Sequence, residues 1–150
     1  MILRRGRKRR GATIVEAAFV LPIAVLFLFG LFEYCRFVFL VQVAENAARE
    51  GARYAVTGTA DGTTKADIQA YVADKMGGRQ GELAGFYVEV ENVNPATGAV
   101  IAGSQWYDAP FGGAIRVKIT GTYSPTLPSF LKLPTSIPLT FESMMSSEAN

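Results

Sequence analysis

The chain has 150 residues, 49% of them hydrophobic, and a formal net charge of +2, which suits one small domain plus a membrane segment. It contains no histidine, so the commonest general base of enzymes is excluded. Its single cysteine, Cys35, excludes an intramolecular disulfide and a multi-cysteine metal site. We therefore expect a protein that is not an enzyme.

The positive charge is concentrated at the N-terminus. Six basic residues lie within the first ten positions: Arg4, Arg5, Arg7, Lys8, Arg9 and Arg10. The rest of the chain has nine basic and 13 acidic side chains and is net acidic. A basic tail of this kind is typical of nucleic-acid binding, of a membrane anchor or of a removable leader. The segment that follows it decides among these.

That segment is apolar. Residues 17–32 carry no charge, and apolar character resumes over residues 37–41. Because a bilayer core about 30 Å thick needs about 20 helical residues, the predicted span runs from Ala17 to about Leu40. It must then tolerate Glu33 and Arg36, which lie three apart on one helix face and can pair. The sequence thus favours the membrane as partner, and no nucleic acid.

Orientation follows from the basic cluster. Lys and Arg directly before a membrane helix hold that end in the cytoplasm, so the C-terminal part is predicted to be translocated. The alternative is a cleaved secretory signal, whose apolar core is 7–15 residues long. The core here is longer, and the chain beyond Val43 still has a helical pattern, so a single-pass protein of the cytoplasmic (inner) membrane is favoured.

A stripe of small side chains extends the predicted helix beyond the membrane. Its members recur at steps of three and four residues: Ala44, Ala47, Ala48, Gly51, Ala52 and Ala55. Such a stripe allows close helix packing, either on the protein's own sheet or on a partner. We expect Ala44, Ala48, Gly51 and Ala55 to make this contact. Thr57-Gly58 ends the segment.

A second, short helix is predicted next. Thr64 and Asp67 form a capping box at its start, and Gly77-Gly78 stops it. One face of this helix is apolar and consists of Ile68, Tyr71, Val72 and Met76.

Alternating residues predict strands after this helix. Residues 86–91 and 115–120 alternate apolar and polar side chains, and a last strand is expected over residues 137–145. The polar faces are acidic on the first strand and basic on the second, which favours antiparallel neighbours with charge-paired contacts. Residues 94–98 form a turn, residues 100–107 are a possible fourth strand, and the proline-rich residues 125–138 are mostly loop.

The predicted fold class is therefore α+β. A long N-terminal transmembrane helix extends into a small extracytoplasmic domain with a second short helix and a three- to four-stranded antiparallel sheet. The predicted organisation is a basic leader over residues 1–11, the long helix over residues 12–57 and the extracytoplasmic domain over residues 58–150.

One motif is specific. Residues 9–16 read RRGATIVE and are followed at once by the apolar helix. A basic leader, a glycine and a glutamate five positions later resemble the arrangement processed in type IV pilins and pseudopilins. The resemblance implies that a prepilin-type peptidase cuts between Gly11 and Ala12, and that Glu16 acts in assembly by neutralising the new amine of a neighbouring subunit. The alternative is that Glu16 is an interfacial glutamate paired with the adjacent arginines.

A wider stretch resembles the TadE-like family, minor pilin-like components of tight-adherence (Tad) pilus systems. The similarity rests on residues 10–22, on GLFEYCR at residues 30–36 and on AAREGARYA at residues 47–55. It is only general beyond, where residues 139–148 are similar to the family's C-terminal strand. Cys35 departs from the glycine expected in the family's Glu-aromatic-Gly-Arg run. The resemblance implies a role in assembling or anchoring the pilus, with other pilin-like subunits or assembly proteins as partners and without catalysis or a cofactor.

Two other functions compete with this one. The first is a membrane-anchored extracytoplasmic binding module unrelated to pili, in which the helix is a plain anchor. The second is a membrane-bound enzyme, which the missing histidine and the lack of clustered acids make remote.

Overall fold

The computed structural model describes residues 10–58, 62–126 and 134–147. Its longest element is α1 (Arg10–Thr57), followed by α2 (Lys65–Lys75) and by the short 3-10 helix η1 (Arg79–Glu82). The strands are β1 (Leu83–Val93), β2 (Ala114–Tyr123) and β3 (Ile137–Ser146), with a second 3-10 helix, η2 (Trp106–Asp108), between the first two. Residues 1–9 of the predicted leader lie outside the described residues.

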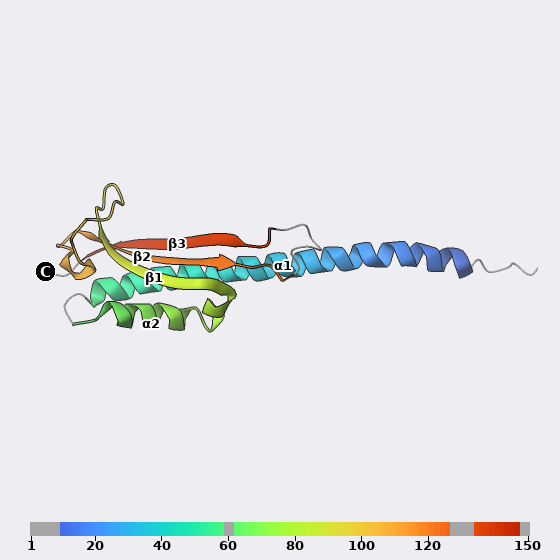
Figure 1. Cartoon of the computed structure of the whole chain (residues 1–150), viewed down its shortest axis with the longest axis horizontal. Helices are drawn as coiled ribbons and strands as arrows, with labels where there is room; N and C mark the ends of the chain where they lie inside the picture. The colour runs from blue at the N-terminus through green and yellow to red at the C-terminus, as the bar shows by residue number, and fades with distance from the viewer. Residues whose placement is uncertain (1–9, 59–61, 127–133, 148–150) are drawn as a thin grey trace, which may run out of the picture.

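The strands form an antiparallel sheet in the order β1-β2-β3, packed on two helices. α1 contacts β2 and β3, whereas α2 contacts β1 and also α1. In Figure 1 the sheet and α2 lie beside the C-terminal part of α1, and the N-terminal part projects away from them. This arrangement confirms the predicted α+β class.

The predicted cross-strand charge pairs are present on the outer face of the sheet. Glu89 is opposite Lys118 and Glu91 is opposite Arg116 in the β1-β2 register. The Arg116 guanidinium lies 2.6 Å from the Glu91 carboxylate, and the Lys118 amine lies 3.4 Å from that of Glu89. These pairs fix which residues face outward, because a one-residue slip would turn the whole strand over.

α2 begins where the sequence predicts. The Thr64 hydroxyl accepts a hydrogen bond from the Asp67 amide, and the Asp67 carboxylate accepts one from the Thr64 amide. Hydrogen bonds from Thr64 to this exposed carboxylate hold the pKa of Asp67 below its usual value. Beyond the C-cap Met76, Gly77 and Gly78 have φ angles of +59° and +80°, which favour glycine and end the helix.

The prediction of a possible strand over residues 100–107 is wrong. Val100 makes only an isolated bridge with Val93, and Trp106 begins the helix η2. The backbone turns at Gly103, whose φ is +79°, and the Asn92 side chain donates a hydrogen bond to the Ser104 hydroxyl. The turn over residues 94–98 is confirmed by amides 96 and 97, which donate to the Asn94 side chain.

The proline-rich residues 125–138 are only partly described. Residues 127–133 lie outside the described residues, and β3 begins at Ile137, where the last strand is predicted, so Pro138 belongs to that strand. Proline is compatible with this position because β3 is at the edge of the sheet.

Candidate functional site

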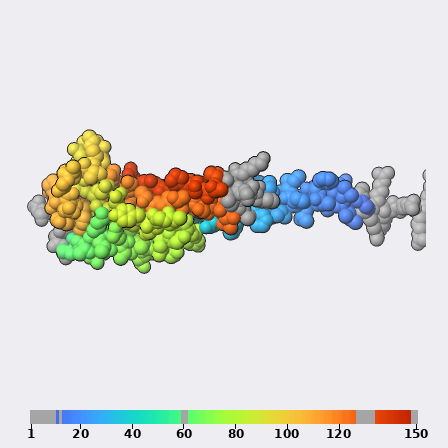
Figure 2. All heavy atoms as spheres, in the orientation of Figure 1, coloured from blue at the N-terminus to red at the C-terminus, as the bar shows by residue number. Residues whose placement is uncertain are grey.

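The N-terminal part of α1 is an exposed apolar rod, which we name the bare segment (residues 11–32). All its described side chains are exposed, and only Gly30 is partly covered. The largest examples are Phe19, 72% exposed, and Phe27, 70% exposed. In Figure 2 this part projects from the domain as a rod one helix wide. An uncovered apolar surface of this size is not stable in water, so a membrane or other apolar helices must cover it.

The length of the bare segment matches a membrane. At 1.5 Å per residue, residues 11–32 extend about 33 Å, against about 30 Å for a hydrocarbon core. α1 is the single helix among the described residues that is long and apolar enough to span a membrane. The last part of the span predicted over residues 17–40 lies against the domain, because both Glu33 and Leu40 are buried there. The covered part of α1 begins directly after Phe32.

The motif at the start of the bare segment lies on an open helix surface. Gly11 is in the first turn of α1 and is exposed, and a Cβ atom added there would meet no atom within 4 Å. Glu16 is exposed as well, about one turn further along α1. The side chain of Ala12 lies outside the described residues. Gly11 and Glu16 are thus accessible from solvent or from a neighbouring molecule.

At the other end of the bare segment, Arg36 is the centre of a polar cluster. Its guanidinium lies 3.4 Å from Glu33 on the same helix and 3.0 Å from Glu82 of η1. It also donates a hydrogen bond of 2.6 Å to the Thr126 hydroxyl and packs over the Tyr123 ring. We name Glu33, Arg36, Glu82, Tyr123 and Thr126 the junction cluster. It links α1 to η1, to β2 and to the residues just after β2.

The buried carboxylate of Glu33 is fully engaged in this cluster. The Tyr123 hydroxyl donates a short hydrogen bond to it, and the Thr126 amide donates another at 3.2 Å. Burial of Tyr123 and this hydrogen bond raise the pKa of Tyr123 to about 12, against the opposing effect of the positive Arg36. The hydroxyl therefore stays protonated and keeps donating to Glu33 at neutral pH.

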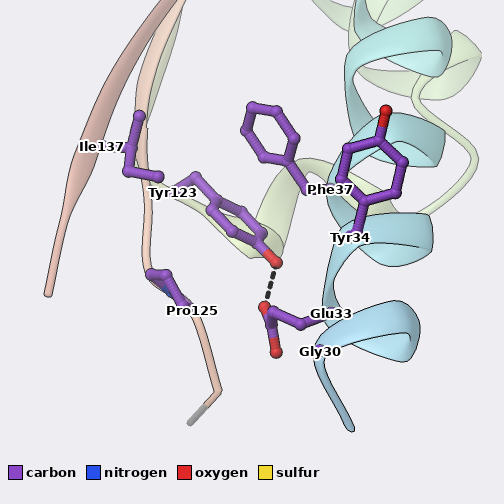
Figure 3. A pocket seen from close by; sticks show the side chains of 7 residues that line it. All are labelled: Gly30, Glu33, Tyr34, Phe37, Tyr123, Pro125 and Ile137. Carbon is purple, nitrogen blue, oxygen red and sulfur yellow. Dashed lines mark hydrogen bonds between the residues drawn. The ribbon is translucent and has the colours of Figure 1, made fainter. Parts of the chain in front are cut away.

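An open cavity of about 410 Å³ lies beside this carboxylate, between α1 and the sheet. We name it the junction pocket (Figure 3). Its helix side consists of Gly30, Glu33, Tyr34 and Phe37, and its sheet side of Tyr123, Pro125 and Ile137. The lining is almost wholly apolar, since the polar atoms of Glu33 and Tyr123 are turned toward each other.

Comparison with known protein families gives one match. Residues 11–53 match the family described as TadE-like protein. This confirms the resemblance predicted from the sequence, and it covers the bare segment and most of the covered part of α1. No curated protein and no solved structure matches the chain.

The small-residue stripe, which lies within the TadE-like region except for Ala55, is in the domain's own core. Ala44, Ala48 and Ala55 are buried among residues of α2 and the sheet. A Cβ atom at Gly51 would lie 2.3 Å from a methyl group of Val72 in α2. The sequence left two alternatives for this stripe, packing on the same chain or packing on a partner. The structure contains the first of these.

The junction cluster was only partly predictable. The spacing of Glu33 and Arg36 predicts their pairing, which the structure confirms. Glu82, Tyr123 and Thr126 follow at least 46 residues later in the chain, and no motif marks them as partners of Arg36. Within the described residues, no group of three or more acidic, cysteine or histidine side chains has a metal-binding arrangement.

Proposed function

We propose that this chain is a non-catalytic, pseudopilin-like membrane component that assists the assembly or anchoring of a Tad-type pilus or secretion apparatus. The observation that carries the proposal is the bare segment, an apolar rod of membrane length inside the region that matches the TadE-like family. Such a rod is suited to two environments, a bilayer and a bundle of similar helices. A subunit that passes from one to the other needs this surface.

The proposed organisation retains the three parts expected from the sequence. Residues 1–11 are a basic cytoplasmic leader, residues 12–57 are the membrane and extended helix, and residues 58–150 are an extracytoplasmic domain. The six basic residues before the apolar segment support this orientation in the cytoplasmic membrane of a bacterium. A reporter enzyme fused after Asn150 should be active only outside the cytoplasm, and cytoplasmic activity would reverse the orientation.

Processing is the second part of the proposal. A prepilin-type peptidase cuts between Gly11 and Ala12, and Glu16 then neutralises the new α-amine of a neighbouring subunit. The accessibility of Gly11 and Glu16 on the helix surface supports both steps. An unpaired carboxylate within a membrane is costly, so a glutamate at this position is best explained by a positively charged partner.

The deciding experiment measures the mass of the mature chain in membranes of the bacterium that encodes it. We expect the wild type to begin at Ala12, and Gly11→Val to accumulate at full length because a branched side chain blocks the narrow site of the peptidase. Glu16→Gln should still be cut, since the change lies beyond the bond. It should nevertheless reduce pilus formation, because it removes the charge that meets the new amine.

Three outcomes count against this proposal. If Gly11→Val has the same mass as the processed wild type, the cleavage site is wrong. If the variant remains at full length yet supports normal pili, processing has no role and the chain is a simple anchor. If deletion of the whole chain leaves pili unchanged, the anchored binding module becomes the better description.

A further inference from the structure

The junction pocket lies at the level where the membrane should end. α1 continues without a break from the bare segment into the domain, so no linker separates the two. Gly30, within the last turn of the bare segment, lines the pocket together with Phe37 and Ile137 of the domain. The pocket is therefore continuous with the surface that faces the bilayer.

The side chains around the pocket have the chemistry of a membrane interface. Tyr34, which lines it, is 65% exposed, and Phe39, which does not line it, is also exposed about one and a half turns further along α1. Exposed aromatic rings gather at the boundary between lipid tails and headgroups. The charged groups of the junction cluster lie at the same level, whereas the pocket beside them is apolar.

We propose that the junction pocket is a lipid site that takes the headgroup-proximal part of a phospholipid acyl chain. Its volume of about 410 Å³ is within the range of small-molecule pockets, which is about 300–1,000 Å³. The carboxylate of Glu33 already holds its hydrogen-bond donors, so the site offers the occupant apolar contacts and no free charge.

A bound chain would place a lipid between α1 and the β2-β3 side of the domain. This inference goes beyond the proposed function and depends only on the bare segment lying in a membrane. Such a lipid would fix the position of the domain on the membrane surface.

The test uses the purified full-length chain in vesicles of phosphatidylcholine and phosphatidylglycerol. A trace of phosphatidylcholine carries a photoactivatable diazirine on its acyl chain, either near the carboxyl end or at the terminal methyl. After irradiation and proteolysis, mass spectrometry locates the label. We expect the carboxyl-end probe to label both the bare segment and the peptides that contain Tyr123 or Ile137, and the methyl-end probe to label the bare segment alone.

A pocket-filling variant sharpens the test. Ile137→Trp should abolish labelling around Tyr123 while labelling of the bare segment is retained. Met144→Trp is the matched control, because Met144 is an exposed residue near the other end of β3 and should leave both labels unchanged. Circular dichroism of both variants checks that the domain is folded. If Ile137→Trp does not fold, the comparison of the two probes on the wild type still decides.

Label on the bare segment without label at Tyr123 or Ile137 overturns the lipid site and leaves the membrane span intact. Crosslinks between copies through the pocket would also overturn it and assign the pocket to a neighbouring subunit. Absence of label from the bare segment would refute the span itself, together with everything that depends on it. The failure of this inference is thus distinguishable from failure of the proposed function, which is measured by processing and pilus formation.

Discussion

One continuous helix, α1, has two parts with opposite surroundings. The bare segment presents large apolar side chains such as Phe19, Phe27 and Leu21 to the outside. The covered part, residues 33–57, instead presents alanine and glycine to its own domain, with Ala44, Ala47 and Ala52 fully buried. Both parts are rich in apolar residues, so hydrophobicity alone does not separate them.

The two parts differ in side-chain size along the small-residue stripe, although larger residues such as Leu40 are also buried in the domain. Small residues bring α1 close to α2 and the sheet, and the domain's own side chains then fill the space around it. Large residues keep neighbours at a distance and expose area that lipid can cover. The boundary between the two is the junction cluster, where polar groups satisfy one another directly after the bare segment.

The largest expected effect comes from placing a large side chain in the small-residue stripe. Gly51→Leu should destabilise the domain by about 3 kcal/mol, because even a Cβ atom there lies 2.3 Å from Val72. Gly11→Leu in the bare segment and Glu45→Leu on the exposed face should change it by less than about 0.5 kcal/mol. Thermal unfolding in detergent measures all three, and equal tolerance would show that α1 is not held by close packing.

The next effect concerns the boundary. Arg36→Met should cost about 2–3 kcal/mol, because it leaves the buried Glu33 carboxylate and Glu82 without their common cation. Arg79→Met is the control: Arg79 also pairs with Glu82 but is 46% exposed, so its loss should cost less than about 1 kcal/mol. Denaturant unfolding compares the two. A smaller loss of unfolding free energy for Arg36→Met than for Arg79→Met would show that the junction cluster does not stabilise the domain.

Tyr123→Phe should have a smaller effect, about 1–2 kcal/mol, since it removes one donor from Glu33 and keeps the ring. The effect depends on pH. The pKa of Tyr123 is about 12 in the folded protein against an ordinary 10.0, so folding favours the protonated hydroxyl. This stabilisation is present below pH 10 and is lost as the pH rises toward 12.

The variant should therefore differ most from the wild type at neutral pH and least near pH 12. Because the chain has six tyrosines, the quantity to measure is the difference between the two proteins across the pH range. A difference that stays constant from pH 8 to pH 12 would contradict the assignment.

The sequence predicts those features that depend on neighbours within one element. The capping box of Thr64 and Asp67, the stripe on α1 and the alternation along β1 and β2 are all local, and all are present. The pairing of Glu89 with Lys118 was also predictable, because charge alternation on two strands has few consistent registers.

Features that join distant segments were not predictable. Whether Glu33 lies in lipid or in protein depends on Tyr123 and Thr126, which fold back on it from about 90 residues away. Hydropathy shows only that apolar residues resume at Phe37, and it does not show that Glu33 and Leu40 are buried in the domain. The prediction of a possible strand over residues 100–107 was wrong for a related reason. The Asn92 side chain donates a hydrogen bond to Ser104 and holds it in a turn, so these residues do not join the sheet.

The smallest expected effect is the most instructive about the two parts of α1. Arg49 and Glu45 pair at 3.4 Å, the same distance that separates Arg36 from Glu33. However, Arg49 and Glu45 are 64% and 49% exposed, whereas Glu33 is buried and has two further partners, Tyr123 and Thr126. Arg49→Gln should therefore cost only about 0.3–0.5 kcal/mol, and high salt should erase even that. Denaturant unfolding of Arg49→Gln and Arg36→Met at low and high salt makes the comparison.

If both losses of stability vanish at high salt, then burial at the junction contributes nothing beyond an ordinary surface ion pair. If only the loss of stability in Arg49→Gln vanishes, the two ion pairs differ in energy despite their equal distances, because only the junction pair is buried.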